Sequence, residues 1–138
     1  MPSRLAVALV VAVAFLVGCG SASSAGTAAN TSLTITYWPT GPSGAAKKTW
    51  RLRCNPAGGT LARPAVACRR LAAGGPKLFA AVPKNVMCAQ VYGGPQTARV
   101  VGTLDGKRIS ARFGRSDGCE LERWNRLSPW LLPRGGVI

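Results

Sequence analysis

Hydrophobic and polar residues alternate along four short segments of this chain. The segments are residues 33–38, 49–54, 97–104 and 107–113. Alternation in runs rich in β-branched and aromatic residues is typical of strands that bury one face. Asp105-Gly106 separates the last two runs and is a strong signal for a tight hairpin. We therefore expect an antiparallel sheet whose final strand buries Ile109, Ala111 and Phe113.

Two further segments have helical patterns. Residues 64–73 start with proline, are rich in alanine and leucine, and are followed by Gly74-Gly75, which favours a helix that ends there. Its buried face is predicted to comprise Val66, Ala67 and Leu71. Residues 119–127 predict a second short helix. The inward positions of that helix are predicted to be Leu121, Trp124, and Leu127 or Asn125. Strands with segregated short helices predict a single α+β domain.

Turn-forming residues separate the first predicted elements. Residues 39–44 read PTGPSG, and residues 55–59 read NPAGG. Both favour breaks in the chain direction rather than strands.

The first 18 residues have the pattern of an export signal. A basic start precedes the apolar residues 5–17, which fit the hydrophobic part of a signal peptide and are few for a membrane span. The run ends in LVGC, residues 16–19, which resembles the lipobox of bacterial lipoproteins. That resemblance implies lipidation of Cys19, with residues 1–18 removed as the signal peptide. An ordinary secretory signal that contains a cysteine by chance is the alternative. Either way, we expect an exported protein, held on the outer face of the cell membrane or secreted.

Residues 19–32 are small and polar, so they are predicted to form a flexible tether. The remaining residues, 33–138, are enough for one small domain with a modest core. Export makes disulfides chemically possible, and disulfides would reinforce such a core.

The charge balance is strongly basic. The chain has 18 lysines and arginines against 4 acidic residues, a formal net charge of +14. The basic residues are scattered, and no nucleic-acid-binding motif is present, so specific binding to nucleic acid is not expected. Acidic lipid headgroups, envelope polymers or an acidic protein are better partners for an exported protein of this charge.

Groups for catalysis are scarce. The chain has no histidine, which excludes Ser-His and Cys-His nucleophile systems and imidazole metal ligands. The four acids are Asp105, Asp117, Glu120 and Glu122, and they offer little for paired carboxylate chemistry. We therefore expect no enzyme, no cofactor and no metal site.

Four cysteines follow Cys19, at positions 54, 68, 88 and 119. None forms a close C-x-x-C pair, so metal binding is disfavoured. The residues alone leave three disulfide pairings open. Pairing in chain order closes a first loop of about 15 residues and would stabilise the domain by about 3 kcal/mol. A metal- or redox-active cysteine protein is a further, weaker alternative.

Several short motifs occur in a familiar order. They are LRCNPAGG, the later Cys68, VMCAQVYGGPQT, LDGKR and SDGCE. Together they resemble the Streptomyces subtilisin inhibitor-like family over nearly all of residues 33–127. The resemblance implies an α+β fold with a five-stranded antiparallel sheet, two helices and two disulfides, Cys54–Cys68 and Cys88–Cys119. It also implies a homodimer and inhibition of subtilisin-like serine proteases by a substrate-like mechanism.

In this family the reactive bond lies between the second and third residues after the cysteine of the V-M-C motif. The resemblance therefore implies a reactive site at Gln90 and Val91. The residues of the protease-binding loop would be Cys88, Ala89, Tyr92 and Gly93. Gln90 would occupy the specificity position, where an uncharged polar side chain suits broad subtilisin-like pockets best. Asp117 stands where the family often has an asparagine that supports the loop, and its carboxylate can only accept hydrogen bonds. A non-inhibitory cationic envelope lipoprotein that binds polyanions or a protein partner is the alternative function.

Overall fold

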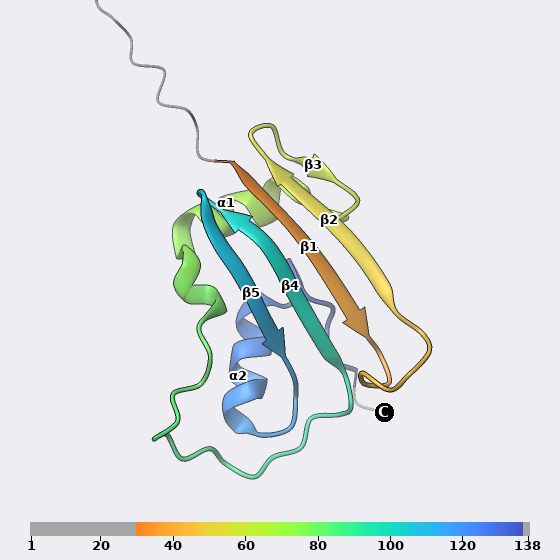
Figure 1. Cartoon of the computed structure of the whole chain (residues 1–138). Helices are drawn as coiled ribbons and strands as arrows, with labels where there is room; N and C mark the ends of the chain where they lie inside the picture. Colours follow the sequence, from red (N-terminus) through yellow and green to blue (C-terminus); the bar gives the residue numbers. More distant parts are fainter. Residues whose placement is uncertain (1–29, 137–138) are drawn as a thin grey trace, which may run out of the picture.

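A five-stranded antiparallel sheet forms the centre of the structure, a computed structural model that describes residues 30–136 (Figure 1). In chain order the elements are β1 (Thr31–Trp38), β2 (Lys48–Cys54), β3 (Gly58–Gly59), α1 (Pro64–Gly74), the 3-10 helix η1 (Pro76–Phe79), β4 (Thr97–Leu104), β5 (Lys107–Phe113) and α2 (Gly118–Leu127). The order of strands in the sheet is β3-β2-β1-β4-β5. The α+β prediction is therefore confirmed. The predicted signal peptide and Cys19 lie outside the described residues.

The four alternating segments form the four long strands of the sheet. β1 pairs with both β2 and β4, so that Ile35 lies opposite Trp50 on one side and Val100 on the other. Asp105 and Gly106 join β4 to β5 with φ of 48° and 76°. Two consecutive positive φ values are what a two-residue hairpin of the favoured hand requires. The predicted hairpin is therefore confirmed.

β1 begins earlier than the predicted tether allows. Thr31 and Ser32 pair with Cys54 and Arg53 of β2, and Thr31 is buried. The Thr31 hydroxyl also accepts a hydrogen bond from the amide of Asp105 at 3.2 Å. The predicted tether boundary at residue 32 is thus wrong by two residues, because small polar residues extend a strand once neighbours on both sides supply backbone partners.

β3 corrects the prediction that residues 55–59 only break the chain. Gly58 and Gly59 turn back to pair with Arg53 and Leu52 as a short edge strand. Gly59 has φ of +111°, and a Cβ there would overlap the Arg51 carbonyl, so this close approach needs glycine. Glycine is depleted in strands, and the sequence pattern therefore concealed this element.

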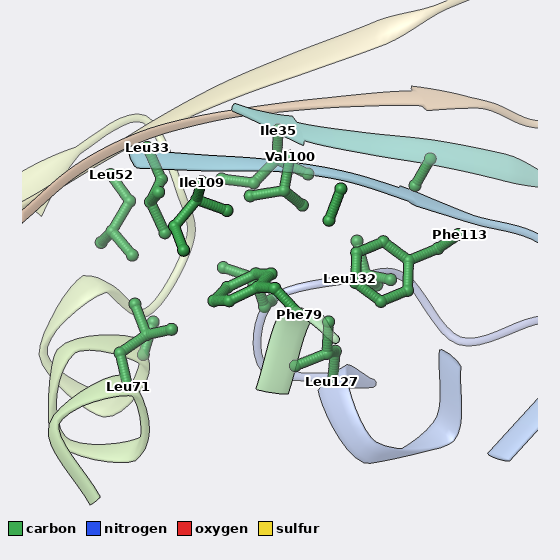
Figure 2. Packing of buried hydrophobic residues seen from close by; sticks show 14 of the residues in the cluster. Leu33, Ile35, Leu52, Leu71, Phe79, Val100, Ile109, Phe113, Leu127 and Leu132 are labelled. Carbon is green, nitrogen blue, oxygen red and sulfur yellow. The ribbon is translucent and has the colours of Figure 1, made fainter. Parts of the chain in front are cut away.

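The core lies between one face of the sheet and the helices (Figure 2). Leu33, Ile35, Val100 and Phe113 point from the sheet toward the helices. The helical side contributes Leu71 of α1, Phe79 of η1, and Trp124 and Leu127 of α2. The predicted inward positions are confirmed for Ala67, Leu71, Trp124 and Leu127, which are buried. Val66 and Leu121 are only partly buried, and the alternative position Asn125 is exposed.

The segment after α2 completes the core. Trp130, Leu131 and Leu132 are buried, although no periodic pattern indicates an element there. The Trp124 indole donates a 2.9 Å hydrogen bond to the Pro133 carbonyl, which fixes this segment against α2. Within residues 30–136, no helix is both long enough and apolar enough to cross a membrane.

Two disulfides are present, with the pairing that the resemblance implied. Cys54–Cys68 joins the end of β2 to α1, and Cys88–Cys119 joins the long segment before β4 to the first turn of α2. All four cysteines of the described domain are therefore bridged.

Candidate functional site

An irregular loop, residues 80–96, connects η1 to β4 along one end of the domain (Figure 1). Long segments without secondary structure are uncommon inside small domains unless they have a function. This loop also carries all of the large apolar side chains that are exposed within the described residues. They are Val86, Met87, Val91 and Tyr92, with exposed fractions of 48, 98, 52 and 70%. Such a cluster indicates a contact surface for another protein.

The first attachment of the loop is covalent. The Cys88–Cys119 disulfide holds the two Cα atoms 5.4 Å apart. It places Cys88, two residues before Gln90, at the N-terminus of α2. Residues 115–119 run from the end of β5 into this helix, and we call them the support segment. They make both of the backbone hydrogen bonds described in the next two paragraphs.

The second attachment is a backbone hydrogen bond at Ala89. The amide of Gly118 donates to the Ala89 carbonyl at 2.8 Å. Gly118 is the first residue of α2, and the first amides of a helix have no partner inside it. The Ala89 carbonyl therefore satisfies a donor that the helix leaves open, with the helix dipole adding to the attraction. A Cβ on Gly118 would lie 3.2 Å from the Ala89 Cβ, a tight approach that the loop would have to relieve by a small shift.

The third attachment lies on the other side of Gln90. The amide of Gly93 donates to the Arg115 carbonyl at 2.7 Å. Gly93 packs so closely on Leu121 of α2 that a Cβ would overlap the leucine side chain. The support segment thus holds the loop at Cys88, Ala89 and Gly93, on both flanks of the intervening residues.

The Asp117 side chain makes its hydrogen bonds next to the loop rather than to it. Its carboxylate accepts the Glu120 amide at 2.9 Å as the N-cap of α2, and the Ser116 hydroxyl lies 3.5 Å from it. The Asp117 carboxylate is thus engaged by a helix amide, and a direct hydrogen bond from it to the loop is not observed within residues 30–136. Asp117 instead positions Gly118 and Cys119, which do contact the loop.

Arg123 secures the entry to the loop and was missed at the sequence level. Its Nε donates to the Ala80 carbonyl at 2.8 Å, and its Nη1 contacts both carboxylate oxygens of Glu120. The guanidinium also lies over the Phe113 ring, 4.6 Å from its centroid. Nothing in the sequence separates this buried arginine from the solvent-exposed ones around it.

The exit from the loop is fixed by Gln96 and Arg115. Gln96 is buried, and its Oε1 accepts a 3.0 Å hydrogen bond from Arg115 Nη1. The same nitrogen donates to the carbonyl of Gly136 at 3.3 Å. Gly135 packs against the guanidinium too closely to admit a Cβ, so the end of the described chain covers this contact.

Gln90 and Val91 lie at the exposed crest of the loop. The Val91 amide donates back to the Ala89 carbonyl at 2.9 Å and closes a three-residue turn centred on Gln90. The loop is therefore turned at this point, rather than fully extended as expected of a segment that adds as a strand. Since the Gln90–Val91 peptide bond is trans, its C=O points opposite to its N–H and thus away from the Ala89 carbonyl. Gln90 itself is exposed, with its side-chain amide 3.5 Å from the Cys88 carbonyl.

One group within residues 30–136 has the spacing of a metal site, Cys88, Asp117 and Cys119, with ligand atoms within 4.8 Å of one another. Both cysteines are bridged to each other, so neither offers a thiolate. The geometry is that of a constrained, exposed peptide bond.

Comparison with protein-family profiles gives one match. The profile described as subtilisin inhibitor-like matches residues 27–114, which include the 80–96 loop and all five strands in full. The chain belongs to the subtilisin inhibitor-like family. Residues 115–136, with the whole support segment and α2, lie beyond the matched range. Among solved structures, Streptomyces caespitosus sermetstatin in complex with Bacillus licheniformis subtilisin is similar, at 24% identity over 75% of this chain and 97% of that chain, with a TM-score of 0.49. No curated protein matches the chain.

Proposed function

We propose that this protein inhibits subtilisin-like serine proteases by offering Gln90–Val91 as a substrate-like bond. One observation carries the proposal: an exposed peptide bond lies between two flanks that are both fixed to residues 115–119. Membership of the subtilisin inhibitor-like family supports the same function.

Binding would use the main chain of the loop and the side chain of Gln90. A loop segment can add to the substrate cleft of a protease through backbone hydrogen bonds, while one side chain enters the specificity pocket. The Gln90 carbonyl points away from the Ala89 carbonyl. It would therefore be open to the pair of hydrogen-bond donors with which a serine protease stabilises the oxyanion. Met87, Val91 and Tyr92 would supply the apolar contact area on either side.

The attachments of the loop to the support segment would make net cleavage of the inhibitor by the protease slow. Ordering a free loop costs about 0.5–1.5 kcal/mol for each immobilised flexible side chain, and a loop that is already fixed avoids part of that cost. After cleavage, the Ala89 and Gly93 hydrogen bonds would still hold the two new ends near each other. The new amine would then attack the acyl-enzyme before water does, which reseals the bond.

The test is a titration of a subtilisin-type protease with the exported protein. We expect stoichiometric loss of protease activity at micromolar inhibitor or below, with the Gln90–Val91 bond largely intact after hours. Trypsin, whose pocket is acidic, should be inhibited much less, because Gln90 carries no positive charge. Absence of inhibition at micromolar protein, or rapid turnover at Gln90–Val91, would contradict the proposal.

We further propose that Cys19 is lipidated and anchors the protein to a membrane. Asn30 precedes β1 at the Asp105-Gly106 end of the sheet, whereas the loop joins β4 at the Trp38 and Thr97 end. The eight residues of β1 separate these ends by roughly 24 Å. A chain that is anchored before Asn30 could therefore present the loop away from the membrane. A Cys19→Ser variant should be released from membranes, and unchanged fractionation would contradict this proposal.

A homodimer, which the resemblance implies, stays a prediction. It can be checked by the mass of the purified protein in solution.

A further inference from the structure

The sheet face opposite the helices carries five exposed arginines and no acidic residue. They are Arg51, Arg53, Arg99, Arg108 and Arg112. The acidic residues of the chain lie elsewhere, one in the β4–β5 turn and three at or in α2. Both ion pairs found within residues 30–136 join residues of α2 to each other. We call this surface the arginine face.

The register of the strands arranges the arginine face as two rims and a floor. Arg51 and Arg53 form one rim on β2, and Arg108 and Arg112 form the other on β5. The two strands are three strand spacings apart, roughly 14 Å. The floor between them is mainly hydroxyl-bearing. Its outward residues are Ser32, Thr34 and Thr36 of β1 and Val101 and Thr103 of β4.

Positive charge is most concentrated where Arg99 and Arg112 lie directly opposite each other on β4 and β5. Like charges at directly opposed positions destabilise a sheet, and no acidic side chain is paired with either arginine within the described residues. The two side chains also line a pocket of about 330 Å³ together with Trp38 and Pro42. An anion bound there would remove the repulsion and would have an aromatic wall beside it.

We propose that the arginine face binds a linear phosphate-bearing polymer, whose phosphates lie along the floor between the two rims. Guanidinium groups donate in a planar fork that matches phosphate oxygens, and every rim position is arginine rather than lysine. Threonine and serine hydroxyls on the floor are further donors to phosphate oxygens. This activity is separate from the proposed inhibition, because the 80–96 loop lies at one end of the sheet and not on this face (Figure 1).

Two other partners fit this face less well. An anionic membrane would contact the rims but leave the hydroxyl floor without partners, and no large apolar side chain is exposed on this face to enter the lipid. A second copy of the chain would set five arginines against five more without any acidic partner, which disfavours association through this face.

The test measures binding of the full-length exported protein, in a mild non-ionic detergent, to labelled long-chain inorganic polyphosphate at several salt concentrations. The unmodified protein should bind, and its affinity should fall steeply with salt. Arg99→Gln/Arg112→Gln should weaken binding about tenfold and lower the salt slope by about 1.4, the value for two lost phosphate contacts. Arg51→Gln/Arg108→Gln provides a second disruption of the face and should weaken binding similarly.

The matched control is Arg63→Gln/Arg69→Gln. It removes the same charge from exposed positions at and in α1, on the helix side of the domain, and should leave binding nearly unchanged. All three double variants should still inhibit subtilisin, which checks their folding independently of the polymer. Equal losses in the face variants and the control would overturn the proposal, because net charge alone would then explain binding. Absence of binding, or stronger competition by phosphatidylglycerol-containing micelles at equal phosphate concentration, would also overturn it.

Discussion

The amide of Gly118 donates a 2.8 Å hydrogen bond to the carbonyl of Ala89, and so ties the N-terminus of α2 to the residue before Gln90. The same carbonyl accepts the Val91 amide at 2.9 Å. One oxygen thus links the support segment, the turn and the exposed peptide bond. The conformation of the proposed reactive site therefore depends on the start of a helix that follows it by almost thirty residues in the chain.

Substitution of Gly118 by alanine should disturb this link without unfolding the domain. The new Cβ would lie 3.2 Å from Ala89 Cβ and 3.4 Å from the Ala89 carbonyl, so the loop would have to shift. We expect subtilisin inhibition to weaken about tenfold, equivalent to about 1.4 kcal/mol, with faster cleavage at Gln90–Val91. Gly114→Ala is the matched control, because a Cβ there meets nothing within 4 Å. Equal inhibition by the two variants would show that the contact has no role in presenting the loop.

The two disulfides should differ in their effect on inhibition. Cys88→Ser/Cys119→Ser removes the covalent attachment beside the reactive bond, and should both lower stability by about 2–4 kcal/mol and convert the protein into a substrate. Cys54→Ser/Cys68→Ser should lower stability too, yet leave the folded fraction inhibitory, because this bridge joins β2 to α1 away from the loop. Thermal unfolding and the rate of cleavage by subtilisin separate the two effects. Similar cleavage rates for the two folded variants would contradict the role given to Cys88–Cys119.

Asp117 should act on the loop through the helix that it caps. Asp117→Ala removes the acceptor of the Glu120 amide, and should cost about 0.5–2 kcal/mol of unfolding free energy while raising the cleavage rate. Asp117→Asn keeps a side-chain oxygen at the same place, so it should retain most of both properties. Chemical denaturation and cleavage by subtilisin measure the two quantities. An Asp117→Ala variant with an unchanged unfolding free energy would show that the cap does not stabilise the domain.

Much of the fold could be predicted because its strands bury one face and leave the other in water. That alternation, with the Asp105-Gly106 turn, identified four strands and a hairpin with nearly correct ends. β3 was missed because two glycines carry no side-chain pattern, and its pairing depends on where β2 already lies. The buried segment after α2 was missed because its apolar residues have no period that indicates an element.

The candidate site was only partly predictable. The loop and its residues came from a motif resemblance, since exposed loop residues leave no periodic signal. Contacts that fix the loop involve backbone groups of Ala89, Gly93 and Gly118, and backbone groups are the same at every residue. Asp117 was assigned to loop support, but its carboxylate caps the helix instead, a distinction that only the positions of nearby amides can make.

Specificity should follow the side chain at position 90. Gln90 is exposed at the centre of the turn, so its replacement should not disturb the core. Gln90→Lys should create measurable inhibition of trypsin, because an ammonium group pairs with an acidic pocket, while Gln90→Gly should weaken inhibition of subtilisin. Inhibition constants against both proteases measure the change. If the inhibition constants did not change with these substitutions, residue 90 would not be the residue that enters the specificity pocket.

Resealing of the Gln90–Val91 bond tests the central claim most directly. Intact protein, and protein nicked only at this bond, would each be incubated with a catalytic amount of subtilisin, and the intact fraction would be followed by mass spectrometry. Because the attachments at Cys88, Ala89 and Gly93 hold the two ends together, both samples should converge on the same mixture of intact and nicked protein. A nicked sample that never regains the bond, while the intact sample is steadily degraded, would contradict the account.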